Sequence, residues 1–348
     1  MNRSAQVLRV SIASVLMLIL SHSAALAMEA QVVYLEGLVD INPRGGGRAA
    51  AYIGDEVRGG DSVITGRDGF AELERGDYTT ITVEPDTIFT VDSVGEKGKE
   101  RDVLRCTLGS VAYRFEQIAG AQEPYLTTPS AGAGIRGTEL TVAAGEDGSS
   151  LFVVRSGEVE VEAEGKTVTL GPEEGVEVRP GEQPGEKFEV KRGQIDYSNW
   201  RQERREAFID DPVAAARGLE RRFDGFVTQV TTLAPLLAEL RRALEQEREK
   251  LIKIGEEQGQ EARTKYYKET VQPIEGETFN TYITLRYYAK SAFSIRRFVL
   301  GRMYVAVKTA YIDDLSHSRY QQFIKIHNTI LQKFTTEVLP HLTDADLM

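Results

Sequence analysis

The sequence predicts a multidomain protein of the segregated α+β class, in which an N-terminal all-β region is followed by an all-α helical bundle. Short alternating runs of apolar and polar residues, each closed by turn residues, fill the first half of the chain. Heptad-spaced apolar residues dominate the second half. Residues 28–193 contain 26 glycines and carry a net charge of −14, whereas residues 194–348 contain 6 and carry +1. These two shifts predict a domain boundary near residue 193.

The composition excludes several classes of protein. With 348 residues, 41% of them hydrophobic and 27% charged, the chain is expected to fold rather than to be disordered. A net charge of −11 argues against a nucleic-acid partner. The single cysteine, Cys106, excludes an intramolecular disulfide and a thiolate metal cluster, and we expect it to be buried and unreactive.

The first 27 residues are expected to be a cleaved secretory signal. Arg3 and Arg9 give a positive start, Val10 to Leu20 is an apolar run, and the segment ends in Ala25-Leu26-Ala27. This run is shorter than the roughly 20 residues that span a bilayer. The mature chain is therefore expected to begin at Met28, to be exported to the periplasm or cell envelope, and to contain no transmembrane span.

The β region, residues 28–193, shows turn signals at intervals typical of a sandwich, barrel or solenoid. No crossover helix is available for a parallel sheet. In chain order, strands are expected around residues 33–35, 70–74, 79–83, 88–91, 104–108, 152–154 and 159–163. The Pro- and Gly-rich stretch 179–185 is expected to be a hinge, with two independently folding units joined near residues 181–196.

The helical region, residues 194–348, opens with a long apolar seam. Eight of nine heptad positions are apolar, which is typical of an antiparallel hairpin or coiled coil and makes the 226–254 helix a candidate for homo-oligomer contacts. The seam residues are Phe226, Val230, Leu233, Leu237, Leu240, Leu244, Leu251 and Ile254. Breaks are expected at 255–259 and 273–276, followed by helices over 278–312 and 316–339, the last stopped by Pro340.

A series of motifs in the β region resembles the FecR domain. They run in family order over roughly residues 31–181, and the Thr-Pro-x-Ala…Arg-Gly-Thr segment is the most specific of them. The motifs are Gly54-Asp55…Gly60-Asp61-Ser62-Val63, Gly69-Phe70-Ala71, Leu108-Gly109-Ser110-Val111, Thr128-Pro129-Ser130-Ala131…Arg136-Gly137-Thr138 and Gly157-Glu158-Val159. The helical region resembles no family that we recognise.

The resemblance implies an all-β fold outside the cytoplasmic membrane. In the regulators that name the family, a cytoplasmic anti-sigma segment and a membrane helix precede the domain, whereas the expected cleavable signal here leads straight into it. The family-motif residues are expected to be structural: Gly60, Asp61, Thr128, Pro129, Gly134, Arg136, Gly137 and Thr138. For Arg136 a ligand contact remains the alternative to a clamp on backbone carbonyls.

Two further patterns have simple structural explanations. Gly132-x-Gly134-x-x-Gly137 matches the dinucleotide fingerprint by letter, but a strand-like segment follows it instead of the required helix, so turns are expected. Four carboxylates alternate with apolar residues from Glu158 to Glu164, which indicates a solvated strand face rather than a calcium site. No catalytic constellation, metal site or cofactor site is apparent, and the three scattered histidines of the helical region are expected at caps or the surface.

The helix over residues 278–312 carries a candidate partner-binding stripe. At 100° per residue, four cations and two aromatic rings share one face, opposite the apolar one. The stripe consists of Arg286, Lys290, Phe293, Arg297, Tyr304 and Lys308. It is either a solvated face or a docking face for an anionic partner: lipid headgroups, an acidic envelope component or the acidic β region itself.

The sequence thus favours an exported, non-catalytic envelope protein, with the β region as a binding or scaffold module and the helices for docking or oligomerisation, and with an envelope protein or an anionic envelope component as partner. A periplasmic FecR-type regulatory component acting through a separate membrane protein is the alternative. A carboxylate-based cell-wall or glycan hydrolase is the second alternative.

Overall fold

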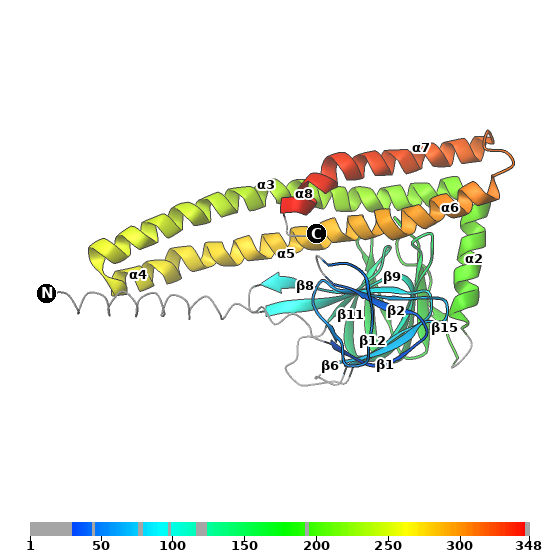
Figure 1. The fold of residues 1–348 in the computed structure, drawn as a ribbon, viewed down its shortest axis with the longest axis horizontal. Helices are drawn as coiled ribbons and strands as arrows, with labels where there is room; N and C mark the ends of the chain where they lie inside the picture. Colours follow the sequence, from blue (N-terminus) through cyan, green and yellow to red (C-terminus); the bar gives the residue numbers. More distant parts are fainter. Residues whose placement is uncertain are drawn as a thin grey trace.

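The computed structural model describes residues 30–43, 46–75, 79–96, 99–115, 124–191 and 195–344. The expected signal, residues 1–27, lies outside them. A curled β region lies beneath a layer of long helices (Figure 1). Its strands are β1 (Ala30–Glu36), β2 (Val39–Asn42), β3 (Ala49–Ala50), β4 (Glu56–Val57), β5 (Ser62–Thr65), β6 (Phe70–Arg75), β7 (Thr79–Val83), β8 (Ile88–Glu96), β9 (Lys99–Phe115), β10 (Tyr125–Thr127), β11 (Gly132–Ala144), β12 (Ser150–Ala163), β13 (Lys166–Leu170), β14 (Glu174–Val178) and β15 (Phe188–Glu189).

These strands form one barrel-like, mostly antiparallel sheet, and the solenoid alternative is not confirmed. The long strand β9 pairs with β8 and β10 along its first part and with β7 and β11 along its second. Only the short β10–β9 pairing is parallel among the described strands. The two halves of a long strand such as β9 therefore belong to different parts of the curled sheet, and the strand bends between them.

Glycines produce those bends. Gly137 interrupts β11 and Gly157 interrupts β12, both with positive φ, at the place where the β11–β12 register shifts. A Cβ at Gly157 would lie 2.5 Å from the carbonyl oxygen of Gly137, so the strands cross too closely there for any side chain. Gly137 has the positive φ that the sequence predicts, 52°, but the prediction of turns between strands is wrong, because Gly132, Gly134 and Gly137 all lie inside β11.

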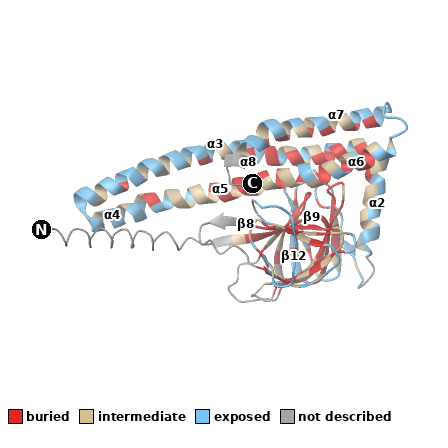
Figure 2. Ribbon diagram, viewed as in Figure 1, coloured by how far each residue is buried: buried red, intermediate tan, exposed pale blue. Residues whose placement is uncertain are grey.

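Each region has its own apolar core, as the buried residues in Figure 2 show. In the β region the inward side chains of nearly all long strands, from Val32 to Val178, form one cluster. In the helical region a second cluster extends from Phe208 to Leu342. Between them, Trp200 and Tyr197 at the start of the first described helix pack against a small patch around Leu151.

The helical region is built around an antiparallel hairpin, and part of it projects beyond the β region (Figure 1). The described helices are α2 (Tyr197–Asp210), α3 (Pro212–Gln258), α4 (Gln260–Tyr266), η1 (Tyr267–Val271), α5 (Gln272–Ser294), η2 (Ile295–Leu300), α6 (Gly301–Ala310), α7 (Ser318–Lys333), η3 (Phe334–Val338) and α8 (Leu339–Asp344), where η marks a π-helical turn. No described helix is both long enough and apolar enough to cross a membrane.

The predicted seam packs α3 against α5, and the predicted break at 255–259 is confirmed, since α3 ends at Gln258 and Gly259 has a φ of 85°. Glu247, the one polar residue in the seam, accepts a hydrogen bond from Tyr266 Oη at 2.5 Å. The other two predicted stops are wrong. Pro273 and Pro340 each come just after a π-helical turn, η1 or η3, and the helix continues through them because the backbone hydrogen-bond pairing that a proline interrupts is already altered in such a turn.

The expected hinge is also fastened to the helices. Gly181 has a φ of 68° and its Cα lies against α3, where a Cβ would come within 2.8 Å of the Gly218 carbonyl oxygen. Arg221 donates a hydrogen bond to that same segment at the Gly181 carbonyl oxygen. The independent folding of the two units stays a prediction, and residues 192–194 at the predicted boundary lie outside the described residues.

Candidate functional site

Several family-motif residues hold the β region together. Asp61 Oδ2 accepts a hydrogen bond from the Arg58 amide at 2.9 Å, which closes the turn that contains Gly60. Thr128 Oγ1 accepts from the Ala131 amide at 3.0 Å and from the Ser150 hydroxyl at 2.7 Å, so this segment is tied to β12. Pro129 offers its carbonyl oxygen to the helical region.

The second half of the motif lies in β11. Thr138 donates its hydroxyl to the Glu158 carbonyl oxygen at 3.0 Å, across the crossing of β11 and β12. Gly134 lies opposite Glu160 in the β11–β12 register. The backbone of Arg136 pairs with Glu158, but its side chain is outside what the structure describes, so the choice between a clamp and a ligand contact stays open.

The cationic stripe does not exist as one exposed face, which corrects the sequence prediction. Arg286 is buried and its guanidinium donates to Asp92 Oδ1 at 2.5 Å, while Lys290 Nζ lies 3.4 Å from Asp92 Oδ2. Asp92, on β8, is itself 1% exposed. These two cations therefore dock on the β region, one of the three anionic partners that the sequence left open.

The error has two causes: the β region covers Arg286 and Lys290, and the π-helical turn η2 redirects the residues that follow. A π turn inserts an extra residue into an α-helix, which rotates everything after it by about 100°. Arg297 lies in this turn and stacks on Phe293 and Phe298, with its guanidinium 5.8 Å and 5.2 Å from the ring centroids. Lys308 lies after it, over the ring of Tyr304. Phe293 and Tyr304 pack against the helical core, and partner binding by Arg297 or Lys308 stays a prediction.

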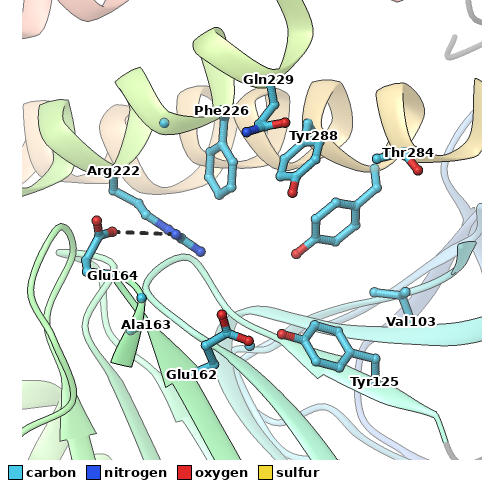
Figure 3. A pocket seen from close by; sticks show the side chains of 14 residues that line it. Val103, Tyr125, Glu162, Ala163, Glu164, Arg222, Phe226, Gln229, Thr284 and Tyr288 are labelled. Carbon is cyan, nitrogen blue, oxygen red and sulfur yellow. Dashed lines mark ion pairs between the residues drawn. The ribbon is translucent and has the colours of Figure 1, made fainter. Parts of the chain in front are cut away.

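Beside this docking interface lies an open cleft of about 620 Å³ between the β region and the hairpin (Figure 3). Its lower wall comes from the β10–β11 segment and from the end of β12, and its upper wall from α3 and α5. The lining includes Val103, Tyr125, Gly132, Glu162, Glu164, Arg222, Phe226, Gln229, Thr284, Tyr287 and Tyr288. In Figure 3, Glu162 points from the strands toward the helices, and Tyr125 lies along the strands with its hydroxyl directed toward Glu162.

Aromatic rings dominate the cleft. Tyr287 and Tyr288 are neighbours on α5 in an edge-to-face arrangement with centroids 5.0 Å apart, and Phe226 of α3 lies 6.2 Å from Tyr288. Tyr125 faces them from β10, where the absence of a side chain at Gly132 makes room for its hydroxyl. Burial raises the pKa of Tyr125 and of Tyr288, so both stay protonated and can donate hydrogen bonds.

Guanidinium groups of the chain already lie on these rings. Arg222 lies 4.6 Å from the centroid of Phe226, Arg101 lies 5.3 Å from that of Tyr125, and Arg105 lies 5.5 Å from that of Tyr287. Arg222 also donates to the Pro129 carbonyl oxygen at 3.0 Å and lies 3.6 Å from Glu164. The rings thus offer their faces to cations in this geometry.

The row of carboxylates extends the cleft along β12. Glu158, Glu160 and Glu162 are exposed on one face, as the sequence predicts, and Glu164 follows in a tight turn with Gly165, where both residues have positive φ. A second hollow of about 400 Å³, lined by these three strand carboxylates with Arg101, Tyr125, Gly134 and Thr167, shares Tyr125 and Glu162 with the first. We call the two hollows together the β12 groove.

Other candidate groups have structural positions. Cys106 is buried as predicted, and burial raises the pKa of its thiol to about 12, which keeps it unreactive. His317 caps α7 by accepting from the Arg319 amide, and His327 packs beside Tyr304 in the helical core. In the described part of the chain no three His, Cys, Asp or Glu side chains are grouped to hold a metal ion.

Sequence reasoning missed the aromatic half of the β12 groove. The glutamate row was visible in the sequence, but its position under α3 and α5 depends on how the two regions dock. Two features of the sequence point to the cleft. One is the pair of adjacent tyrosines Tyr287-Tyr288 in a helix whose other turns carry core and polar residues in alternation, and the other is Tyr125 just before the Thr-Pro motif. Rings at half-buried positions of this kind are common at binding surfaces.

An antiparallel β region covered by a helical hairpin defines the architecture of this protein. Residues 61–160 match the family model described as "FecR protein", which confirms the resemblance over that part of the β region. The helical residues fall outside this match. No curated protein matches the chain.

Two solved structures resemble part of the chain. Both are of a "putative anti-sigma factor" from Parabacteroides distasonis ATCC 8503. One matches with 18% identity and a TM-score of 0.34, covering 40% of this chain and 64% of the other; the second gives 16%, 0.31, 37% and 60%. The match spans less than two thirds of either of those chains, and at these scores neither structure informs the function of this one.

Proposed function

We propose that this chain is an exported, non-catalytic binding protein of the cell envelope, in which the FecR-containing β region and the helical hairpin together form one binding site. The observation that supports it is the cleft between Tyr125 and Glu162 on one wall and Phe226, Tyr287 and Tyr288 on the other. A cleft of this size with convergent aromatic and polar groups is the usual form of a binding site.

The docking interface supports a rigid rather than a hinged relationship between the two walls. The ion pairs of Arg286 and Lys290 with Asp92 lie on β8, near one end of the cleft. At other points of the interface Arg204 pairs with Glu177 at 2.9 Å and Arg205 with Glu146 at 2.6 Å. A cleft held at several places keeps its shape before the ligand arrives, which lowers the entropy cost of binding.

The second candidate is a FecR-type regulatory component that acts through a separate membrane partner. The FecR match at residues 61–160 favours it. In this case the cleft, or the projecting part of the hairpin, contacts that membrane protein. Both candidates require a partner at the envelope, and they differ in whether that partner is a membrane protein.

Site-specific photo-crosslinking in the producing cells tests the proposal. A photoreactive phenylalanine replaces Gln229, which lines the cleft on α3, and in a second strain it replaces Gln332, which is exposed on α7 away from the cleft. We expect a specific adduct from position 229 and none from position 332. Adducts from 332 alone, or from neither position, would refute the cleft as the binding site.

The same experiment separates the two candidates by the identity of the adduct. A membrane-spanning protein trapped at position 229 supports the regulatory candidate, whereas a soluble envelope protein or a cell-wall fragment supports the binding protein. Fractionation of the same cells tests export: the mature chain is expected outside the cytoplasm with Met28 at its N-terminus. Recovery of the full-length chain in the cytoplasm would contradict it.

A further inference from the structure

The chemistry of the β12 groove indicates which ligand it takes. We infer that the groove binds an extended polypeptide segment of a partner that carries lysine or arginine at alternate positions, with one cationic side chain entering the aromatic cleft. This inference rests on the proposed function, because it names the ligand class of that same cleft.

The first argument is the aromatic wall. Tyr125, Phe226 and Tyr287 already each have a guanidinium of this chain within 4.6 to 5.5 Å of the ring centroid. An aromatic face attracts cations through its quadrupole, most strongly where water is partly excluded. Tyr288, which also lines the cleft, has no such cation in the described part of the chain, and it lies above Glu162 in Figure 3. The inference places one lysine or arginine side chain of the partner between this ring and this carboxylate.

The second argument is charge complementarity. Among its described side chains the groove holds four carboxylates, from Glu158 to Glu164, against the two guanidinium groups of Arg101 and Arg222. Arg222 is engaged by Glu164 and Pro129. For Glu160 and Glu162 no ion pair is present among the side chains that the structure describes. An anionic or strongly acidic ligand would be repelled here, whereas a cationic one gains at each carboxylate.

The third argument is spacing. Alternate residues on one strand face are about 6.6 to 6.8 Å apart, so Glu158, Glu160 and Glu162 form a row with this repeat. A polypeptide in extended conformation places its own alternate side chains at the same repeat. A basic strand lying along β12 can therefore match several carboxylates in register, which a compact cation cannot.

The experiment uses the whole mature chain and synthetic peptides, with binding measured by isothermal titration calorimetry at low and high salt. The probe alternates lysine with threonine, and its isomer has the same composition with the lysines in one block. We expect the alternating peptide to bind more tightly than its isomer, and its affinity to fall as salt rises, because exposed charges are screened.

Two variants with equal charge change locate the binding. Glu160→Gln with Glu162→Gln removes two groove carboxylates, whereas Glu182→Gln with Glu186→Gln removes two exposed carboxylates of the β region that do not line the groove. We expect the groove variant to weaken peptide binding by about fivefold or more, and the control variant by less than about twofold. Equal losses in both variants, or equal affinity for the blocked isomer, would overturn the inference.

A neutral oligosaccharide of N-acetylglucosamine is the competing probe, since tyrosine rings and carboxylates also suit sugars. Binding of this probe at the groove, without binding of the alternating peptide, would overturn the cationic ligand and leave the proposed binding protein intact. If no probe binds and position 229 traps no partner in cells, the proposed function itself fails.

Discussion

The two regions of this molecule deal with charge in opposite ways. The β region has a large excess of carboxylates, which lie on its surface and along β12. The helical region is nearly neutral, but many of its cations point toward the β region. Arg204, Arg205, Arg222 and Arg286 each meet a carboxylate of the β region. The difference in net charge between the two halves of the sequence therefore marks a domain boundary and also reflects the ion pairs that join the two regions.

Two glutamates of the groove have no ion-pair partner in the described structure. Glu160 and Glu162 are exposed next to the interface at which Arg222 and Glu164 meet. The same acidic surface thus serves two purposes: part of it docks the helices, and the rest is open to a ligand. Variants of single residues can test the docking part and the ligand-binding part of this surface separately.

Asp92→Asn is expected to have the largest effect. The change takes the carboxylate away from the buried Arg286 and the partly buried Lys290, and removing one partner of a buried ion pair costs about 3–5 kcal/mol. Denaturant unfolding measures the loss. Asp40→Asn is the matched control, because its partner Arg48 is half exposed and the pair contributes less than about 1 kcal/mol. Equal losses for the two variants would show that the docking interface does not depend on this buried cluster.

Gly157→Ala is expected to destabilise the β region by about 1–3 kcal/mol, because φ is positive and the added Cβ would meet the Gly137 carbonyl oxygen. Gly137→Val is expected to lose a similar amount. The matched control is Gly276→Ala in α5, where nothing lies near the new methyl group and helix propensity favours alanine by about 0.5–1 kcal/mol. Thermal unfolding of the three variants checks this, and an unchanged melting temperature for Gly157→Ala would contradict the account of the strand crossing.

Glu177→Gln tests how firmly α2 holds the two regions together. Glu177 accepts hydrogen bonds from Arg204 at 2.9 Å and from Trp200 Nε1 at 3.1 Å, and loss of the charge is expected to cost about 1 kcal/mol. Limited proteolysis between the β region and α2 should become faster than in the unmodified chain. An unchanged rate would mean that this link is held by the apolar contacts of Trp200 instead.

His327 gives the smallest expected effect, and it concerns the helical region alone. Burial lowers the pKa of its imidazole below the ordinary value of 6.5, so the unfolded chain binds a proton more readily than the folded one. The contribution of neutral His327 to the free energy of unfolding is therefore present above pH 6.5 and is lost as the pH falls through the folded-state pKa. Unfolding measured between neutral and mildly acidic pH should show a shallower slope in His327→Gln, and an identical slope would exclude His327 as the source.

The sequence predicted what depends on local pattern and missed what depends on docking. Alternation in the strands and the heptad seam of α3 are local, and both regions follow them. The helix stops predicted at Pro273 and Pro340 were wrong, because the π-helical turns η1 and η3 that precede these prolines are not visible in the sequence pattern. The stripe failed because Arg286 and Lys290 dock on the β region and η2 rotates the helix after them. The aromatic cleft was not visible because its walls come from two separate stretches of the chain, residues 103–165 and 222–288.

Crosslinking from both walls tests the central claim, that one site spans the two regions, most directly. A photoreactive phenylalanine at Thr167 on the β wall and one at Gln229 on the helix wall are compared by mass spectrometry of the adducts. The account predicts that both positions trap the same partner, at adjacent residues of that partner. Different partners from the two positions, or an adduct from only one wall, would contradict it.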